Sequence, residues 1–392
     1  MAENSSRLVV QMLVAGMLVS GVMNTILSKY QDLQCVENCN SPGRARSFEQ
    51  PVWQTLNMFL AESLCWVILG LYRLFSHHSH KVGYEPIPVH YDSPAVETLL
   101  ERGGKRQHMH GNQILLLALP ALCDIFGTTL MNTGLLFTPA SIFQMTRGAL
   151  VLFVGLFSVV FLRSHLRIYH WISLVLVVLG VCIVGFAGAI YSDHSVDSFS
   201  AIHAQVNKDI ALKTLLGVML ILCGQLFTAT QFVFEEHILE KYSLEPLKVV
   251  CWEGTFGLMC TLIAMLVLHF AYGAGTKGYF DIAQGWSEVT SSPKIWGAAI
   301  AIMFSISSFN FFGLSVTRTV SATARSTIDT LRTLGIWVLS LYLGWETFKW
   351  LQVIGFIVLV YGTFVFNGIV RMPWQKEVSD EEFLPEEPTE HF

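Results

Sequence analysis

Charged residues are scarce in this chain, and their scarcity excludes most soluble folds. Asp, Glu, Lys and Arg make up 14% of its 392 residues, against about 25% in an ordinary soluble domain. Hydrophobic residues make up 53%, and the mean hydropathy is +0.51. The net charge of -5 is spread over loops and tails without a basic patch, so we expect no nucleic-acid partner. This composition is typical of a polytopic membrane protein whose surroundings are the lipid bilayer.

Two further signals are missing from the sequence. The apolar run that begins near Leu8 has no small-residue cleavage site and is long enough to span a bilayer, so we interpret it as a membrane helix rather than a cleaved signal peptide. The predicted membrane boundaries carry neither a Gly-x-Ser-x-Gly turn nor a paired-Asp motif. We therefore expect a protein that is not an enzyme and that uses no cofactor.

Long apolar stretches recur along the chain, each near the roughly 20 residues that a membrane helix needs. They lie at 8–28, 52–75, 112–135, 139–162, 168–190, 211–234, 247–272, 294–316, 320–344 and 348–370. An even number of spans places both termini on one side, and the loops on that side are the richer in Lys and Arg. The positive-inside rule then predicts that both termini are cytosolic.

The polar segments predict little chemistry of their own. The loop at about 76–111 is rich in histidine but lacks regular ligand spacing, so we expect a flexible cytosolic loop rather than a metal site. Its Tyr84 begins a tyrosine-x-x-bulky pattern of the kind that vesicle-sorting adaptors read. The acidic tail at 371–392 is predicted to be disordered and cytosolic. Cys35 and Cys39 form a disulfide if their loop faces an oxidising lumen, and are two free thiols otherwise.

Two of the apolar stretches carry an arginine inside the predicted span. Arg147 lies in the fourth stretch and Arg332 in the ninth. A charge in that position costs roughly 2.5–3.5 kcal/mol, so it must face a partner or a water-filled cavity. Arg325 lies four residues before Asp329 and Arg332 three after it, so we expect Asp329 between two guanidiniums on one helix face. Two such helices predict a polar cavity enclosed by the bundle, and therefore transport.

The charges also predict an internal duplication. When Arg147 is laid over Arg332, Gln144 falls over Asp329; likewise Glu62 matches Glu253, and Asp124 lies near the place of Asn310. Five helices repeated twice enter the membrane from opposite sides, which is the inverted-repeat arrangement of secondary transporters. The predicted fold class is an all-α polytopic membrane protein with ten transmembrane helices as two inverted five-helix repeats. The repeats are predicted at 1–190 and 191–370, although chance alignment of apolar sequence remains the alternative.

Motifs in both predicted repeats resemble a known family. Residues 141–149 (SIFQMTRGA) are similar to the fourth-helix signature of the drug/metabolite transporter superfamily and, within it, to solute carrier family 35, subgroup F. Residues 329–333 (DTLRT) resemble the ninth helix of the same subgroup. The resemblance covers about 8–370 and implies transport by alternating access. Residues 21–25 (GVMNT) show a more distant likeness to the chloroquine-resistance-type transporters of acidic vacuoles.

The buried polar residues divide into two predicted roles. Rigid guanidinium forks and neighbouring polar groups suit recognition of a solute's anionic or polar groups, and carboxylates in an apolar cavity suit binding and release of protons. The first role is predicted for Arg147, Gln144, Arg332, Asp329, Asn24 and Asn310; the second is predicted for Glu62, Asp124 and Glu253. The alternative for each of them is a structural role, in which acids and arginines pair and polar side chains join helices.

The leading hypothesis is a secondary transporter of a small organic solute across an endomembrane, coupled to protons. A nucleotide-sugar antiporter and a non-transporting scaffold that binds other proteins are the alternatives. The resemblances favour the lysosome, a vacuole or the Golgi as the compartment. A homodimer is compatible with the sequence, and sorting adaptors at Tyr84 are a further candidate partner.

Overall fold

The protein is described by a computed structural model in which helices dominate. The described residues are 2–37, 39, 46–48, 50–81, 109, 111–138, 143, 146–162, 167–192, 203–273, 281–345, 348, 350–366 and 369–370. Gln144, Tyr84, the histidine-rich part of the predicted loop at 82–108 and the tail at 371–392 lie outside these ranges. Predictions for them therefore stay predictions.

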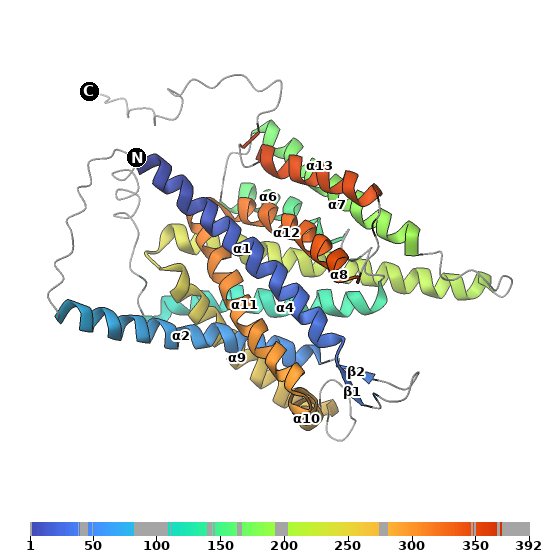
Figure 1. Cartoon of the computed structure of the whole chain (residues 1–392), viewed down its shortest axis with the longest axis horizontal. Helices are drawn as coiled ribbons and strands as arrows, with labels where there is room; N and C mark the ends of the chain where they lie inside the picture. The colour runs from blue at the N-terminus through green and yellow to red at the C-terminus, as the bar shows by residue number, and fades with distance from the viewer. Residues whose placement is uncertain are drawn as a thin grey trace.

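Five main helices come first along the described part of the chain (Figure 1). They are α1 (Ala2–Asp32), α2 (Pro51–Lys81), α4 (Ala118–Phe137), which the 3-10 helix η1 (Gly111–Leu117) precedes, α6 (Leu150–Phe161) and α7 (Ile168–Ser192). Two short antiparallel strands, β1 (Cys35–Glu37) and β2 (Arg46–Ser47), lie between α1 and α2. Helix α2 continues to Lys81 and so extends into the stretch predicted as a loop.

A second set of five main helices follows in the described part of the chain. They are α8 (His203–Lys241), α9 (Pro246–Leu268) with the π-helical turn η3 (His269–Gly273), α11 (Pro293–Thr319), α12 (Ala322–Tyr342) and α13 (Trp350–Phe366). A short amphipathic helix, α10 (Ile282–Thr290), lies between η3 and α11. Helix α8 extends beyond the predicted stretch at both ends, since 211–234 was limited by apolar composition and not by helix-breaking residues.

Six helical segments in the described ranges are long and apolar enough to cross a membrane. They are Leu8–Asp32, Pro51–Leu71, Gly111–Leu135, Leu215–Lys241, Pro246–Gly273 and Pro293–Thr319. Three apolar helices are shorter: Leu150–Phe161, Ile168–Ile183 and Trp350–Phe366. Helix α12 is long, but it carries Arg325, Asp329 and Arg332. The prediction of an all-α membrane protein is confirmed.

The outer surface of the helices is apolar, as expected for helices that face lipid. On α13 the exposed side chains Trp350, Ile354, Ile357 and Tyr361 recur every three to four residues and form one stripe along the helix. The opposite face of α13 buries Gln352 and Thr363. A soluble monomer rarely exposes so large an apolar surface.

Four helix pairs make the most extensive contacts: α4 with α8, α7 with α13, α1 with α11, and α2 with α9 (Figure 1). Glycine allows the closest of these approaches. A Cβ atom on Gly180 of α7 would lie 2.6 Å from the backbone nitrogen of Leu359 in α13, and one on Gly134 of α4 would lie 2.8 Å from the carbonyl oxygen of Gly217 in α8. Small residues at such crossings let backbones pack closely where lipid provides no hydrophobic driving force.

The strands and α10 meet at one end of the molecule (Figure 1). The structure joins Cys35 to Cys39 by a disulfide beside β1. Glu288 of α10 is buried and forms an ion pair with Arg46 of β2. Its carboxylate also accepts hydrogen bonds from Gln50 Nε2 at 2.8 Å and Gln284 Nε2 at 2.7 Å. These contacts tie the connection between α1 and α2 to the connection between α9 and α11.

Candidate functional site

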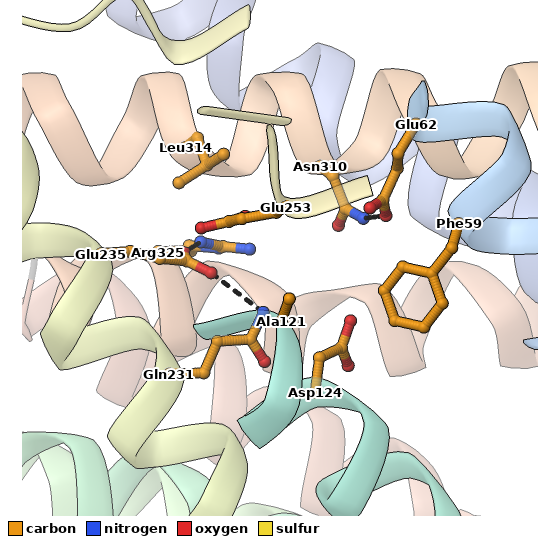
Figure 2. A pocket seen from close by; sticks show the side chains of 10 residues that line it. All are labelled: Phe59, Glu62, Ala121, Asp124, Gln231, Glu235, Glu253, Asn310, Leu314 and Arg325. Carbon is orange, nitrogen blue, oxygen red and sulfur yellow. Dashed lines mark hydrogen bonds and ion pairs between the residues drawn. The ribbon is translucent and has the colours of Figure 1, made fainter. Parts of the chain in front are cut away.

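A cluster of carboxylates lies in the interior of the bundle, where six helices meet. We call it the acidic pocket (Figure 2). Its lining comes from α2, α4, α8, α9, α11 and α12: Phe59, Glu62, Ala121, Asp124, Gln231, Glu235, Glu253, Asn310, Leu314 and Arg325. The open space within it is small, on the order of what one water molecule needs. Side chains therefore fill most of the acidic pocket in this structure.

Among the residues that the structure describes, Arg325 is the one basic residue in the lining of the acidic pocket. Its guanidinium forms an ion pair with Glu235 of α8 and lies over the ring of Phe232, 4.0 Å from the centroid. The other carboxylate oxygen of Glu235 accepts a hydrogen bond from Gln231 Nε2 at 2.9 Å. Gly313 of α11 makes room for the guanidinium, because a Cβ atom there would lie 2.8 Å from Arg325 Nε. The Arg325 charge is thus neutralised by Glu235, while its Nε atom is buried without a hydrogen-bond partner.

Glu62 and Glu253 meet where α2 crosses α9. The crossing is close because of Gly254, where a Cβ atom would lie 2.6 Å from the backbone nitrogen of Ser63. Both carboxylates are buried, Glu62 with 3% and Glu253 with 7% of its surface exposed. Glu62 accepts a hydrogen bond from Asn310 Nδ2, whereas Glu253 Oε1 has no hydrogen-bond partner. The two glutamates that the predicted duplication matched therefore face the same pocket.

The second matched pair also lines the acidic pocket. Asp124 comes from α4 and Asn310 from α11, and both side chains lie in the same closed space (Figure 2). Asn310 was predicted to bind solute, and the structure gives it a hydrogen bond to Glu62. All three residues predicted to carry protons, namely Glu62, Asp124 and Glu253, are brought together here.

A second charged group, which we call the arginine cluster, consists of Arg147, Asp329 and Arg332. Arg332 Nε lies 3.3 Å from Asp329 Oδ1, one turn away on α12, and its guanidinium lies 4.9 Å from the ring centroid of Phe309. Arg147 precedes α6, and its charged neighbours are Arg332 and Asp329. The arginine cluster therefore carries two positive charges and one negative charge.

Helix α1 passes directly beside the arginine cluster. A Cβ atom on Gly21 would lie 2.6 Å from Arg332 Cδ, so only glycine fits this crossing without displacement. Asn24, predicted to bind solute, lies one turn further along α1, and its side-chain oxygen is buried without a hydrogen-bond partner. Gln144, predicted to share this site, lies outside the described residues.

The structure corrects one predicted contact and adds residues to the site. The prediction that Asp329 lies between two guanidiniums is wrong for Arg325, whose guanidinium reaches Glu235 on α8 instead. Glu235 and Gln231 were not predicted as site residues. The predicted span ended at 234, so Glu235 was assigned to a loop. The continuation of helical sequence to Lys241, without Gly or Pro, was the signal that could have placed it inside.

Apolar helices that enclose buried carboxylates and arginines define a multi-pass membrane protein with a polar interior. Comparison with known proteins specifies the class. Residues 98–186 match the EamA-like transporter family. An uncharacterized protein of Schizosaccharomyces pombe is 38% identical over 360 residues, which cover 91% of this chain and 97% of that protein. Solute carrier family 35 member F6 of Homo sapiens is 34% identical over 367 residues, which cover 92% of this chain and 90% of that protein.

The chain belongs to solute carrier family 35, within the drug/metabolite transporter superfamily, and is a membrane transporter by family. The predicted resemblance to this family is confirmed, and membership of a transporter family agrees with the expectation of a protein that is not an enzyme. A solved crystal structure matches with a TM-score of 0.55 over 92% of this chain and 97% of that chain. Because its sequence is only 12% identical, it supports the fold alone. The likeness to chloroquine-resistance-type transporters stays a prediction.

Proposed function

We propose that this protein is a secondary transporter that moves a small organic solute across an endomembrane by alternating access, driven by protons. The observation that carries the proposal is the acidic pocket in the interior of the bundle, with an unpaired buried carboxylate oxygen on Glu253. An isolated ionised carboxylate is too costly to keep in an apolar interior, so it is neutralised by a proton or by a bound cation. A pocket that opens to each side in turn therefore carries protons as well as solute.

We propose further that the chain is two inverted five-helix repeats with ten membrane spans. Helix packing supports this arrangement. In chain order, α1, α2, α4, α6 and α7 of the first set correspond to α8, α9, α11, α12 and α13 of the second. If each helix is exchanged for its counterpart, the packed pair α1–α11 becomes the packed pair α8–α4, while the pairs α2–α9 and α7–α13 are unchanged. The next most extensive pairs, α1–α12 and α6–α8, also exchange. Such a pattern is expected of two repeats related by a two-fold axis that passes near α2, α7, α9 and α13.

In this arrangement the acidic pocket lies between the repeats. Its residues on α2 and α4 belong to the first repeat, and those on α8, α9, α11 and α12 belong to the second. Rocking of one repeat against the other changes which side the pocket faces. Glu62, Asp124 and Glu253 hold and release the protons, and Arg147 and Arg332 direct hydrogen-bond donors to a polar group of the solute.

The proposed orientation places both termini in the cytosol. The distribution of Lys and Arg among the loops supports this side, and so does the disulfide between Cys35 and Cys39, which requires an oxidising compartment at the opposite end. The lysosome, a vacuole and the Golgi are the proposed compartments.

Reconstitution of the purified full chain into liposomes tests the proposal. We expect uptake of at least one solute from a broad panel, accelerated by an imposed pH gradient, and loss of that acceleration in Glu253→Gln. Uptake that ignores the pH gradient contradicts proton coupling. Exchange of a nucleotide sugar for a nucleotide supports the antiporter instead. Absence of any uptake, by protein with a normal unfolding profile, supports a scaffold.

A further inference from the structure

We infer that the transported solute is an organic cation, and that its charged group binds in the acidic pocket at Glu253 and Glu62 in exchange for protons. This inference rests on the proposed function, and it names the chemical class of solute that the same pocket selects.

The charge balance of the acidic pocket is the first argument. Four carboxylates line it, on Glu62, Asp124, Glu235 and Glu253, against the single guanidinium of Arg325. That guanidinium forms its ion pair with Glu235, so its charge balances one of the four. The α11 side chains in the lining, Asn310 and Leu314, carry no charge. Up to three negative charges remain for protons or a bound cation to balance.

The position of Glu253 is the second argument. Glu253 lines the pocket and has only 7% of its surface exposed (Figure 2). Its Oε1 atom is buried without a hydrogen-bond partner. Glu62 faces the same space and accepts a hydrogen bond from the neutral amide of Asn310. An ammonium group placed between the two glutamates would satisfy the unpaired oxygen and offset both charges.

The remaining lining favours an organic cation over an inorganic one. Phe59, Ala121 and Leu314 present apolar surface in the same pocket. An aromatic ring also attracts a cationic group over its face. Within the part of the chain that the structure describes, no group of three or more His, Cys, Asp or Glu is arranged to hold a metal ion. The combination fits an amine or quaternary ammonium with an apolar body.

The same residues disfavour an anionic solute. A phosphate or diphosphate would bring further negative charge beside Glu62, Asp124 and Glu253, with Arg325 already held by Glu235. Like charges in a poorly solvated site repel strongly. In the exchange step the arriving cation takes the place of a proton, which leaves the carboxyl group for water. On the other side a proton returns to the carboxylate as the cation departs.

Matched probes of opposite charge test the inference in liposomes that contain the full chain and a pH-sensitive dye. The probes are benzyltrimethylammonium, benzenesulfonate, the neutral phenyl glucoside and a nucleotide sugar. We expect saturable, proton-linked uptake of benzyltrimethylammonium at least about tenfold faster than that of benzenesulfonate, a difference of roughly 1.4 kcal/mol. Proton-linked uptake of the anion or the neutral probe without the cation overturns the inference but leaves the proposed function intact. No proton-linked uptake of any of these probes also overturns the inference, whereas the proposed function is contradicted only when the broad panel described above fails as well.

Two glutamine variants test the assigned residue. Glu253→Gln keeps the size of the side chain and removes its charge, and we expect it to lose proton-linked uptake of benzyltrimethylammonium. Glu236→Gln is the matched control. Glu236 is also buried, but it lies outside the pocket lining and accepts a hydrogen bond from the backbone of Ala322. Thermal unfolding shows whether each variant is folded. Normal cation uptake by Glu253→Gln, or equal loss in both folded variants, overturns the assignment.

Discussion

The acidic pocket and the arginine cluster each contain one arginine–carboxylate ion pair, but the charge that remains unpaired is negative in the pocket and positive in the cluster. In the acidic pocket, Arg325 of α12 reaches across to Glu235 of α8, and three acids are left over. In the arginine cluster, Arg332 pairs with Asp329 one turn away on the same helix, and Arg147 is left over. The first turn of α12 thus faces a surplus of negative charge from other helices, and two turns later the same helix lies in a surplus of positive charge. The first pair joins two helices, whereas the second orders only one.

The largest expected effect comes from removal of one partner of the interhelical pair. We expect Arg325→Met to lower the free energy of unfolding by about 3–5 kcal/mol, because it leaves the Glu235 carboxylate buried without its counter-ion. Denaturant titration in detergent measures the change. The double variant Arg325→Met with Glu235→Met is the control, and we expect it to recover most of the loss. A single variant as stable as the parent would show that the pair does not bind α8 to α12.

The glycines beside the two arginines provide the next comparison. Gly313→Ala places a methyl group against Arg325 Nε, and Gly21→Ala places one against Arg332 Cδ. We expect each to lower the free energy of unfolding by about 1–3 kcal/mol through overpacking. Gly297→Ala is the matched control on α11, since nothing lies within 4 Å of its Cβ position. It should be neutral or stabilising. Equal effects at Gly313 and Gly297 would mean that the Arg325 guanidinium moves aside freely.

The role of the unpaired positive charge in the arginine cluster is tested by the rate of solute uptake rather than by the free energy of unfolding. We expect Arg147→Gln to slow gradient-driven solute uptake about tenfold, roughly 1.4 kcal/mol, with an unchanged unfolding midpoint. Arg147→Lys keeps the positive charge but not the planar guanidinium, so we expect its uptake rate to lie between those of the parent protein and Arg147→Gln. Uptake by Arg147→Gln at the parent rate would remove Arg147 from the transport site.

The smallest effect is expected from neutralising the local pair. Asp329→Asn retains an acceptor beside Arg332, whose guanidinium also rests on the Phe309 ring. We expect a loss of about 1 kcal/mol, the usual net value of one hydrogen bond. The same amide substitution in Glu235→Gln should cost several times more, since it disrupts contact between helices. Both are measured by the same unfolding titration, and equal losses would erase the distinction between a local and an interhelical pair.

Residue spacing in the sequence was sufficient to predict an ion pair within one helix, but not an ion pair between two helices. The pair of Asp329 with Arg332 follows from a separation of three residues, which any helix brings to one face. The partner of Arg325 depends on how α12 packs against α8, which spacing does not encode, and so the local interpretation was wrong. Glu62 and Glu253 were matched by position in a predicted repeat, and the structure places both in the lining of one pocket.

The end of the molecule that bears the strands was the least predictable part. Cys35 and Cys39 were recognised as a disulfide candidate because they lie in one polar segment. The short helix α10 and the convergence of Arg46 and Gln50 on Glu288 were not predicted, because polar connections lack the periodicity from which helices are recognised.

That convergence has a consequence for how the two connections would separate. Arg46 and Gln50 come from one connection, Glu288 and Gln284 come from the other, and a single buried carboxylate holds three of these side chains together. If the two connections separated only partly, the buried Glu288 carboxylate would lose some of its partners before water could replace them. Partly separated conformations are therefore disfavoured. The connection that carries Arg46 and Gln50 should therefore separate from α10 in one step, with both contacts to Glu288 lost together, and not gradually.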